Sequence, residues 1–378
     1  MYQITPALGW NTWNTFMGDI NEELVLRSAD MLANSPLKKA GYEYIVIDDC
    51  WSLRERDKDG RLVADPEKFP HGMKYVGDYI HSLGLKFGMY SCAGALTCAG
   101  YPGSYEHEFI DAETFASWGV DYLKYDFCYR SSVVPPHLLY KRMGLALSNC
   151  GRDILFSACS WGAEMTYKWI RETGAHSWRS TMDIMDCWSS VKDLITMQLP
   201  LFEYNGQGCF NDMDMLICGM NGKGAVSRGG CTPAEYHTHF AFWCFFGSTL
   251  MLGSDIRQMD EETLKLVTNP ALLRINQDKK YCQPFPIGRK SDTYPLLAKF
   301  LDDGKIAIGF FNLTDGTTSA WHATFLTDEL GIPESTGKKL KLTDTADGSV
   351  LYSKNGCFSV PNTAAHASRV YIAEVVDA

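Results

Sequence analysis

The sequence lacks a long hydrophobic run and any excess of positive charge. Its longest uncharged apolar stretch, residues 240–253, has 14 residues, whereas a helix that crosses about 30 Å of hydrocarbon needs about 20. The 35 Lys and Arg side chains are outnumbered by 45 Asp and Glu, for a net charge of −10, and they form no cluster. We therefore expect no membrane partner and no nucleic-acid partner, and a neutral or cationic ligand instead.

Paired cysteines at metal-binding spacing are also missing. The 13 cysteines include no Cys-x-x-Cys motif, and an odd number spread over 378 residues does not suggest a disulfide framework. The first residues, Met1 to Ile4, have neither the basic nor the apolar region of a secretory signal. We therefore predict a mostly reduced, cytoplasmic protein, although a signal already removed would leave no trace.

Short β-rich runs alternate with helical stretches up to about residue 278, including one after Asn21 and one over residues 165–172. The eight β-rich runs are residues 7–13, 42–51, 85–92, 121–128, 153–159, 175–179, 209–215 and 248–255. Eight such alternations predict an α/β fold, a (β/α)8 TIM barrel. An open doubly wound sheet is less favoured, because the turn from Gly9 to Trp13 lacks the glycine-rich pattern of that fold.

The pattern changes after residue 278. Pro284, Pro286 and Gly288 resemble a linker, and short strands without intervening helices follow. These expected strands are residues 305–312, 338–343, 350–352 and 369–376. We predict two domains, a barrel of residues 1–280 and a small C-terminal antiparallel β-sandwich of residues 281–378.

Charged side chains gather at the predicted C-terminal ends of the strands, where barrel enzymes have their active sites. They are Asp48, Asp49, Lys124, Asp126, Arg179, Asp183 and Asp214. A single Asp after a strand is usually a turn or capping residue, so the argument depends on their convergence. Two cations in the same pocket oppose a metal, and among the histidines only His176 falls near a strand end, so we expect neither a metal nor a cofactor.

Carboxylates and cations beside tryptophans, without a phosphate-binding loop, suit a neutral sugar. Hydrolysis of a glycoside needs one ionised and one protonated carboxyl group on opposite sides of the anomeric carbon. A neighbouring cation keeps a carboxylate ionised. Asp126, two residues after Lys124 on the same face of a strand, therefore fits the nucleophile.

The sequence resembles glycoside hydrolase family 27, which contains α-galactosidases and α-N-acetylgalactosaminidases. The shared motifs, in order along the whole barrel, are Gly9-Trp10-Asn11-Thr12-Trp13, Ile47-Asp48-Asp49-Cys50-Trp51, Thr97-Cys98-Ala99-Gly100-Tyr101-Pro102-Gly103, Trp118-Gly119-Val120-Asp121, Lys124-Tyr125-Asp126, Trp178-Arg179 with Asp183, Asn211-Asp212-Met213-Asp214-Met215 and Ile275-Asn276-Gln277-Asp278. The resemblance implies a retaining exo-glycosidase with a barrel and a C-terminal antiparallel β domain.

The resemblance also implies residue roles. Asp126 would be the nucleophile, and Asp183 the general acid that later acts as the base. The implied substrate contacts are Asp48 and Asp49 at O4 and O6, Lys124 at O3 and O4, Arg179 near O2 and O3, Trp10 and Tyr90 as walls, and Asp214 as a supporting residue. Cys98 and Cys128 match a pair that the family bridges beside the pocket, whereas Cys50 and Cys159 have no evident partner.

One departure concerns the substrate. Ser160 stands where strict galactosidases of the family have a Glu, and the family's N-acetylgalactosaminidases combine Ser and Ala at the positions of Ser160 and Ala163. We predict an α-galactosidase whose substrate carries a terminal α-galactose, with a monomer and a homo-oligomer both open. The main alternative is an α-N-acetylgalactosaminidase, and a more remote one is a noncatalytic sugar-binding barrel, which would be expected to lose Asp126 or Asp183.

Overall fold

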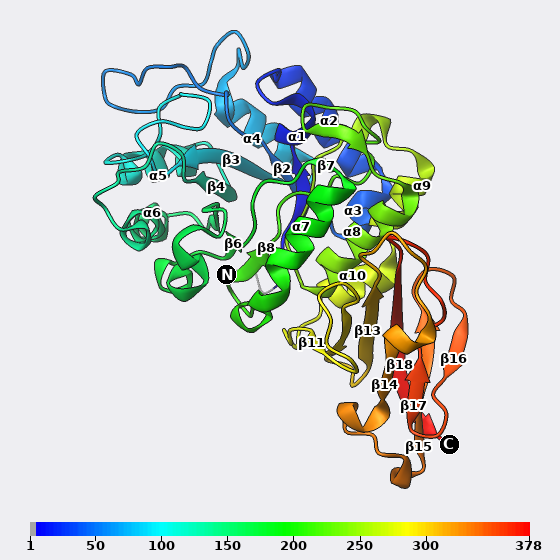
Figure 1. Ribbon diagram of the computed structural model, residues 1–378. Helices are drawn as coiled ribbons and strands as arrows, with labels where there is room; N and C mark the ends of the chain where they lie inside the picture. Colours follow the sequence, from blue (N-terminus) through cyan, green and yellow to red (C-terminus); the bar gives the residue numbers. More distant parts are fainter. Residues whose placement is uncertain (1–4) are drawn as a thin grey trace.

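The computed structural model describes residues 5–378 and has two parts, a barrel and a smaller antiparallel sheet below it in Figure 1. Residues 1–4, on which the argument about a secretory signal was based, lie outside the described residues. The barrel strands are β1 Leu8–Asn11, β2 Tyr44–Val46, β3 Lys86–Cys92, β4 Tyr122–Asp126, β5 Leu155–Ala158, β6 Ser177–Arg179, β8 Phe210–Asp212 and β10 Leu250–Leu252. Each predicted run contains one of them.

The eight strands are parallel and pair in sequence order, and β10 also pairs with β1. The circle closes where Leu216, just after β8, forms a parallel bridge with Leu252 of β10. The predicted (β/α)8 barrel is therefore confirmed. A two-stranded ribbon of β7 Asp186–Cys187 and β9 Ser227–Gly230, which the sequence analysis did not predict, lies outside the barrel sheet.

Helices follow the barrel strands: α1 Trp13–Phe16, α2 Glu22–Asn34, α3 Pro36–Ala40, α4 Gly72–Ser82, α5 Glu108–Ser117, α6 Pro136–Asn149, α7 Trp188–Gln198, α8 Pro233–Phe245, α9 Glu261–Val267 and α10 Pro270–Asn276. Helix α2 begins as predicted, since the Asn21 side chain accepts a hydrogen bond from the Leu24 amide at 2.9 Å.

The helix predicted over residues 165–172 is wrong. That segment forms 3₁₀ turns, η1 Ala163–Lys168 and η2 Ile170–Thr173, because Glu164 and Met165 have left-handed φ of 51° and 54°.

The long apolar stretch of the sequence forms the end of α8 and strand β10. Every residue from Phe240 to Phe246 is buried, because α8 lies between the barrel and the second part of the protein (Figure 1). Phe242 and Phe245 contact Phe311 of the antiparallel sheet, with ring centroids 5.0 and 5.9 Å apart. A helix buried on all sides is apolar all round. Among the described residues, no helix is both long and apolar enough to cross a membrane.

The second part is a six-stranded antiparallel sheet in the order β11-β12-β13-β18-β15-β16. Its strands are β11 Phe285–Pro286, β12 Leu296–Phe300, β13 Ile306–Phe311, β15 Lys338–Asp344, β16 Val350–Tyr352 and β18 Ser368–Asp377. A ribbon of β14 Thr324–Leu326 and β17 Cys357–Ser359 covers one face, with the 3₁₀ turns η5 Ala320–Ala323, η6 Thr327–Leu330 and η7 Glu334–Thr336 nearby. The predicted sandwich thus consists of a six-stranded layer and a two-stranded layer. Strands β11, β12, β14 and β17 were not predicted.

Strand β13 shows how the sheet joins the barrel. Ile306, Ile308 and Phe310 belong to the core under the ribbon, whereas Ala307 and Phe311 belong to the barrel core. Alternate side chains of a strand point to opposite faces, so one face of the sheet packs against α8. Both faces of the sheet are buried, and the sheet lies against one side of the barrel (Figure 1).

Candidate active site

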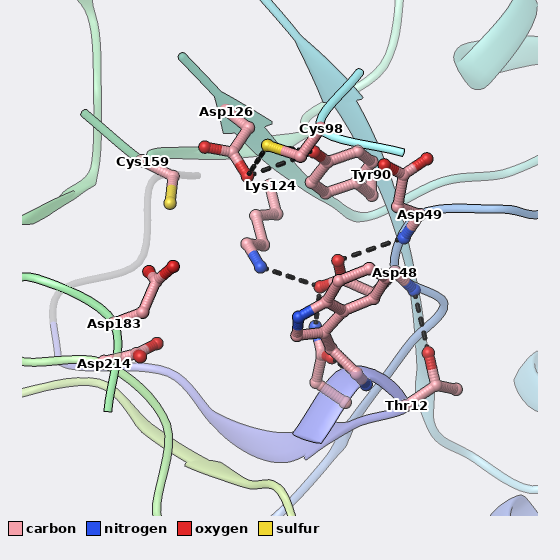
Figure 2. A network of polar contacts seen from close by, with 12 residues as sticks. Thr12, Asp48, Asp49, Tyr90, Cys98, Lys124, Asp126, Cys159, Asp183 and Asp214 are labelled. Atoms are coloured by element: carbon pink, nitrogen blue, oxygen red, sulfur yellow. Dashed lines mark hydrogen bonds and ion pairs between the residues drawn. The ribbon is translucent and has the colours of Figure 1, made fainter. Parts of the chain in front are cut away.

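Two adjacent carboxylates follow β2, and both are buried. Asp48 Oδ2 accepts hydrogen bonds from Lys124 Nζ and from Asn11 Nδ2, each at 2.8 Å (Figure 2). Asp49 accepts from the amides of Cys50 at 2.7 Å and Ala99 at 2.9 Å, while burial raises its pKa. The carboxylates of Asp48 and Asp49 are therefore pre-oriented hydrogen-bond acceptors, and Asp48 contacts the Lys124 ammonium group. Such a combination of acceptors and a donor suits vicinal hydroxyl groups.

Asp126 is the last residue of β4 and is also buried. The Tyr90 hydroxyl donates to its Oδ2 at 3.0 Å, and the Phe127 amide donates to its Oδ1 at 2.9 Å. Burial raises the pKa of Asp126 to about 6, and the charge of Lys124 opposes that shift. The side chain is thus held rigidly and is ionised only above about pH 6.

The third group is organised around Arg179, at the end of β6. Its guanidinium is buried and donates from Nη2 to Asp183 Oδ1 at 2.8 Å, and Nη1 lies 3.0 Å from Asp214 Oδ1. Asp214 also accepts from the Ile184 amide at 2.7 Å, so it anchors the loop that carries Asp183. The Asp183 side chain itself is 64% exposed. Arg179 and Asp214 thus position a carboxylate that remains open to solvent.

The two candidate catalytic carboxylates differ in their electrostatic surroundings. Partial burial of Asp183 raises its pKa. The charge and hydrogen bond of Arg179 and the charge of Lys124 have the larger effect, so the pKa of Asp183 is lowered overall. Asp126 is shifted in the opposite direction. In Figure 2 both carboxylates face the space around the Lys124 side chain. One space therefore holds two carboxylates whose pKa values are driven apart, which is typical of acid–base sites.

A disulfide between Cys98 and Cys128 joins the loops that follow β3 and β4. Cys98 Sγ lies 3.5 Å from Asp126 Oδ2, and the next amide, of Ala99, holds Asp49. The bridge implied by the family resemblance is present, and the other eleven cysteines are free. Cys98, Asp126 and Cys128 also cluster as metal-ligand types do, but two bonded sulfurs offer no thiolate.

Removing this disulfide should weaken both the fold and the site. The bridge closes a loop of 30 residues, so the double variant Cys98→Ser/Cys128→Ser should lose about 3–4 kcal/mol of unfolding free energy. Because Cys98 touches Asp126, we also expect kcat/KM to fall by about tenfold. Urea unfolding and kinetics would measure both, with Cys282→Ser as the control. Unchanged values would show the bridge to be dispensable for both the fold and the site.

The remaining predicted residues are placed less directly in the site. Trp10 is completely buried and its indole N–H donates to the Ser254 carbonyl at 2.8 Å, so its side chain forms no exposed wall. Ser160 is buried, with its hydroxyl 2.7 Å from that of Thr166. Ala163 is half-buried at the start of η1. The small Ser160 side chain therefore already has a hydrogen-bond partner in Thr166.

Two site residues were missed by the sequence analysis. The buried thiol of Cys159, after β5, lies 3.4 Å from Arg179 Nη1 and faces Asp126 and Asp183 in Figure 2. Asn11, at the end of β1, donates to Asp48. Both positions obey the rule that functional side chains lie at the C-terminal ends of the strands. Neither side chain carries a charge, which was the property used to select the other candidates.

The chain is similar to known proteins over most of its length. The family model described as "Alpha galactosidase A" matches residues 5–278. The chain is 40% identical over 340 residues to α-galactosidase A of Cellvibrio japonicus, covering 86% of this chain and 81% of that protein. The crystal structure of α-galactosidase I from Mortierella vinacea superposes with a TM-score of 0.88 at 32% identity, covering 98% and 96% of the two chains. The Saccharomyces cerevisiae α-galactosidase with raffinose superposes with a TM-score of 0.83 at 27% identity over 98% of each chain.

Proposed function

The chain belongs to the α-galactosidase A family, within glycoside hydrolase family 27, and from that membership we propose that it releases terminal α-linked D-galactose with retention of configuration. The observation that carries this proposal is the pair Asp126 and Asp183 facing one space beside the Asp48–Lys124 ion pair. The raffinose complex of the yeast relative supports a galactoside as the ligand. Turnover of a panel of p-nitrophenyl α-glycosides tests the proposal. Binding without turnover would favour a noncatalytic sugar-binding barrel.

The proposed reaction has two displacements. The Asp126 carboxylate attacks the anomeric carbon, the bond from that carbon to the leaving oxygen breaks, and the proton of Asp183 goes to this oxygen. The product is a galactosyl ester of Asp126 and a free alcohol. Asp183 then takes a proton from water, the water oxygen bonds to the anomeric carbon, and Asp126 is released. Two inversions at one carbon restore the α configuration.

Asp183 must carry a proton for the first step, yet the neighbouring Arg179 holds the pKa of Asp183 low. A bound leaving group would cover this exposed carboxylate, and loss of water raises a carboxyl pKa. Asp126 must be deprotonated for the same step, and it is ionised above about pH 6. We therefore propose that substrate binding itself completes the protonation of Asp183, after Asp126 has already lost its proton.

The second candidate is hydrolysis of α-N-acetylgalactosaminides. The observation that favours it is the small, buried Ser160 with its hydroxyl engaged by Thr166, followed by Ala163. A Glu at position 160 could accept from a 2-hydroxyl group but would clash with a 2-acetamido group. The small side chains at these two positions thus avoid the clash that a Glu would make with an acetamide.

Replacing Ser160 with Glu should change the preference between the two sugars. We expect measurable turnover of p-nitrophenyl α-N-acetylgalactosaminide by the wild type, and a shift of the kcat/KM ratio toward the galactoside of about 10- to 100-fold in Ser160→Glu. The measurement is that ratio for both sugars in both proteins. No acetamido-sugar turnover, or an unchanged ratio, would count against this second activity.

A further inference from the structure

The turn that carries Asp48 and Asp49 has an unfavourable backbone conformation. Cys50, which ends the turn, has a left-handed φ of 67°, a region that residues with a side chain seldom adopt. The Cys50 amide donates to Asp49 Oδ1 at 2.7 Å, and the Asp49 amide donates to Asp48 Oδ1 at 3.0 Å. The directions of both carboxylates therefore depend on this turn, and such a conformation persists only where neighbouring groups hold it.

Lys68 holds the turn from its outer side. Its ammonium group donates to the carbonyls of Cys50 and Gly18, each at 2.8 Å. Gly18 follows α1 and packs against Cys50, since a Cβ on Gly18 would lie 3.3 Å from the Cys50 sulfur. Hydrogen bonds from a charged donor are about twice as strong as neutral ones. One ammonium group therefore joins the backbone segments that follow β1 and β2.

The backbone around Lys68 is itself fixed. The chain between Cys50 and Lys68 doubles back on itself, with an antiparallel bridge between Ser52 and Ala64. The Lys68 carbonyl accepts from the Glu22 amide, at the start of α2, at 2.8 Å. The Lys68 side chain is half-buried. Its ammonium group thus has a defined position from which to hold the Cys50 carbonyl.

We propose that Lys68 is a positioning residue for sugar binding, which acts through the turn and the Asp49 carboxylate. Without the ammonium group, the Cys50 carbonyl would lose its charged partner and the left-handed turn would relax. Asp49 would then leave the position that the amides of Cys50 and Ala99 define, whereas the two catalytic carboxylates, on β4 and after β6, would stay in place. The inference rests on the proposed function and deepens it, because it identifies what orients a carboxylate of the sugar site.

The test is the substitution Lys68→Met, which keeps the length of the side chain and removes its charge and its donors. We expect the KM for p-nitrophenyl α-galactoside to rise about tenfold and kcat to change by less than about threefold, since Asp49 would bind the sugar rather than the breaking bond. Lys68→Arg restores a cationic donor and should return KM to within about threefold of the wild type. Thermal unfolding measures the fold of each variant.

The matched control is Lys38→Met. The Lys38 ammonium group also donates to a backbone carbonyl, that of Gly84, but Gly84 lies just before β3, at the N-terminal ends of the barrel strands. This control removes the same kind of contact on the side of the barrel away from the site, so KM should not change. An unchanged KM in Lys68→Met, or an equal rise of KM in both variants, would overturn the proposal.

A double variant tests whether Lys68 acts through Asp49. In an Asp49→Asn background, Lys68→Met should lower kcat/KM by less than about twofold, because the turn no longer carries the carboxylate. A full tenfold loss in that background would overturn the action through Asp49.

Failure of the wild type to hydrolyse p-nitrophenyl α-galactoside would overturn the proposed function alone. The dissociation constant of galactose, measured by calorimetry, would then decide the role of Lys68. Binding that is about tenfold weaker in Lys68→Met would support the positioning role, and unchanged binding would overturn it.

Discussion

Replacing Asp126 with Ala should reduce kcat by at least about 10⁴-fold, because no other group can form the covalent galactosyl intermediate. The fold should survive. Asp126 is buried at the end of a strand and burial raises its pKa, so its charged form is already unfavourable there. The kinetics of p-nitrophenyl α-galactoside hydrolysis give the loss, and thermal unfolding checks the fold.

The same variant tests the direction of attack. Azide can enter the space left by Asp126 and attack the anomeric carbon, so Asp126→Ala with azide should give β-galactosyl azide. The wild type should release α-galactose first, as seen by proton NMR before mutarotation. Asp126→Asn serves as a control of similar size and should be equally inactive. Release of the β anomer first by the wild type, or activity of Asp126→Ala within tenfold of the wild type, would contradict the nucleophile assignment.

Replacing Asp183 with Ala should have the second largest effect, and that effect should depend on the leaving group. For a galactosyl disaccharide, whose leaving alcohol needs a proton, we expect kcat/KM to fall by about 10³-fold or more. For α-galactosyl fluoride the first step needs little proton transfer, so its rate should fall much less. Because Asp183 is the proposed acid, the alkaline decline of kcat should also disappear, while the acidic decline of kcat/KM from Asp126 near pH 6 should remain.

A matched control is Asp193→Ala, which removes an exposed carboxylate from α7. It should leave both the rates and the pH profile unchanged. An equal loss of activity of Asp183→Ala on the disaccharide and on the fluoride would indicate a structural role for Asp183. In that case its contact with Arg179, at 2.8 Å, would be the reason, since Arg179 would lose one of its two carboxylate partners.

Much of the fold could be predicted from local patterns. A buried parallel strand must be apolar and short, and the eight runs from residue 7 to residue 255 satisfied this at regular spacing. Elements of two or three residues, such as β14 and β17, carry too few side chains to show a period. The segment 165–172 failed for another reason: its side chains have helical spacing, but Glu164 and Met165 adopt left-handed backbone angles that no side-chain pattern reveals.

The sequence by itself determined the chemical character of the site. Strand-end carboxylates, Lys124 two residues before Asp126, and the ordered motifs along the barrel identified a sugar hydrolase, because those features depend on residue type and spacing. Only the tertiary structure decided which groups touch. Lys124 of β4 pairs with Asp48, which follows β2, across the intervening strand β3, and Arg179 holds both Asp183 and Asp214. The pKa of Asp126 is raised while that of Asp183 is lowered. These contacts join residues up to 76 positions apart, and burial and charge at such distances depend on how the strands pack rather than on any local pattern.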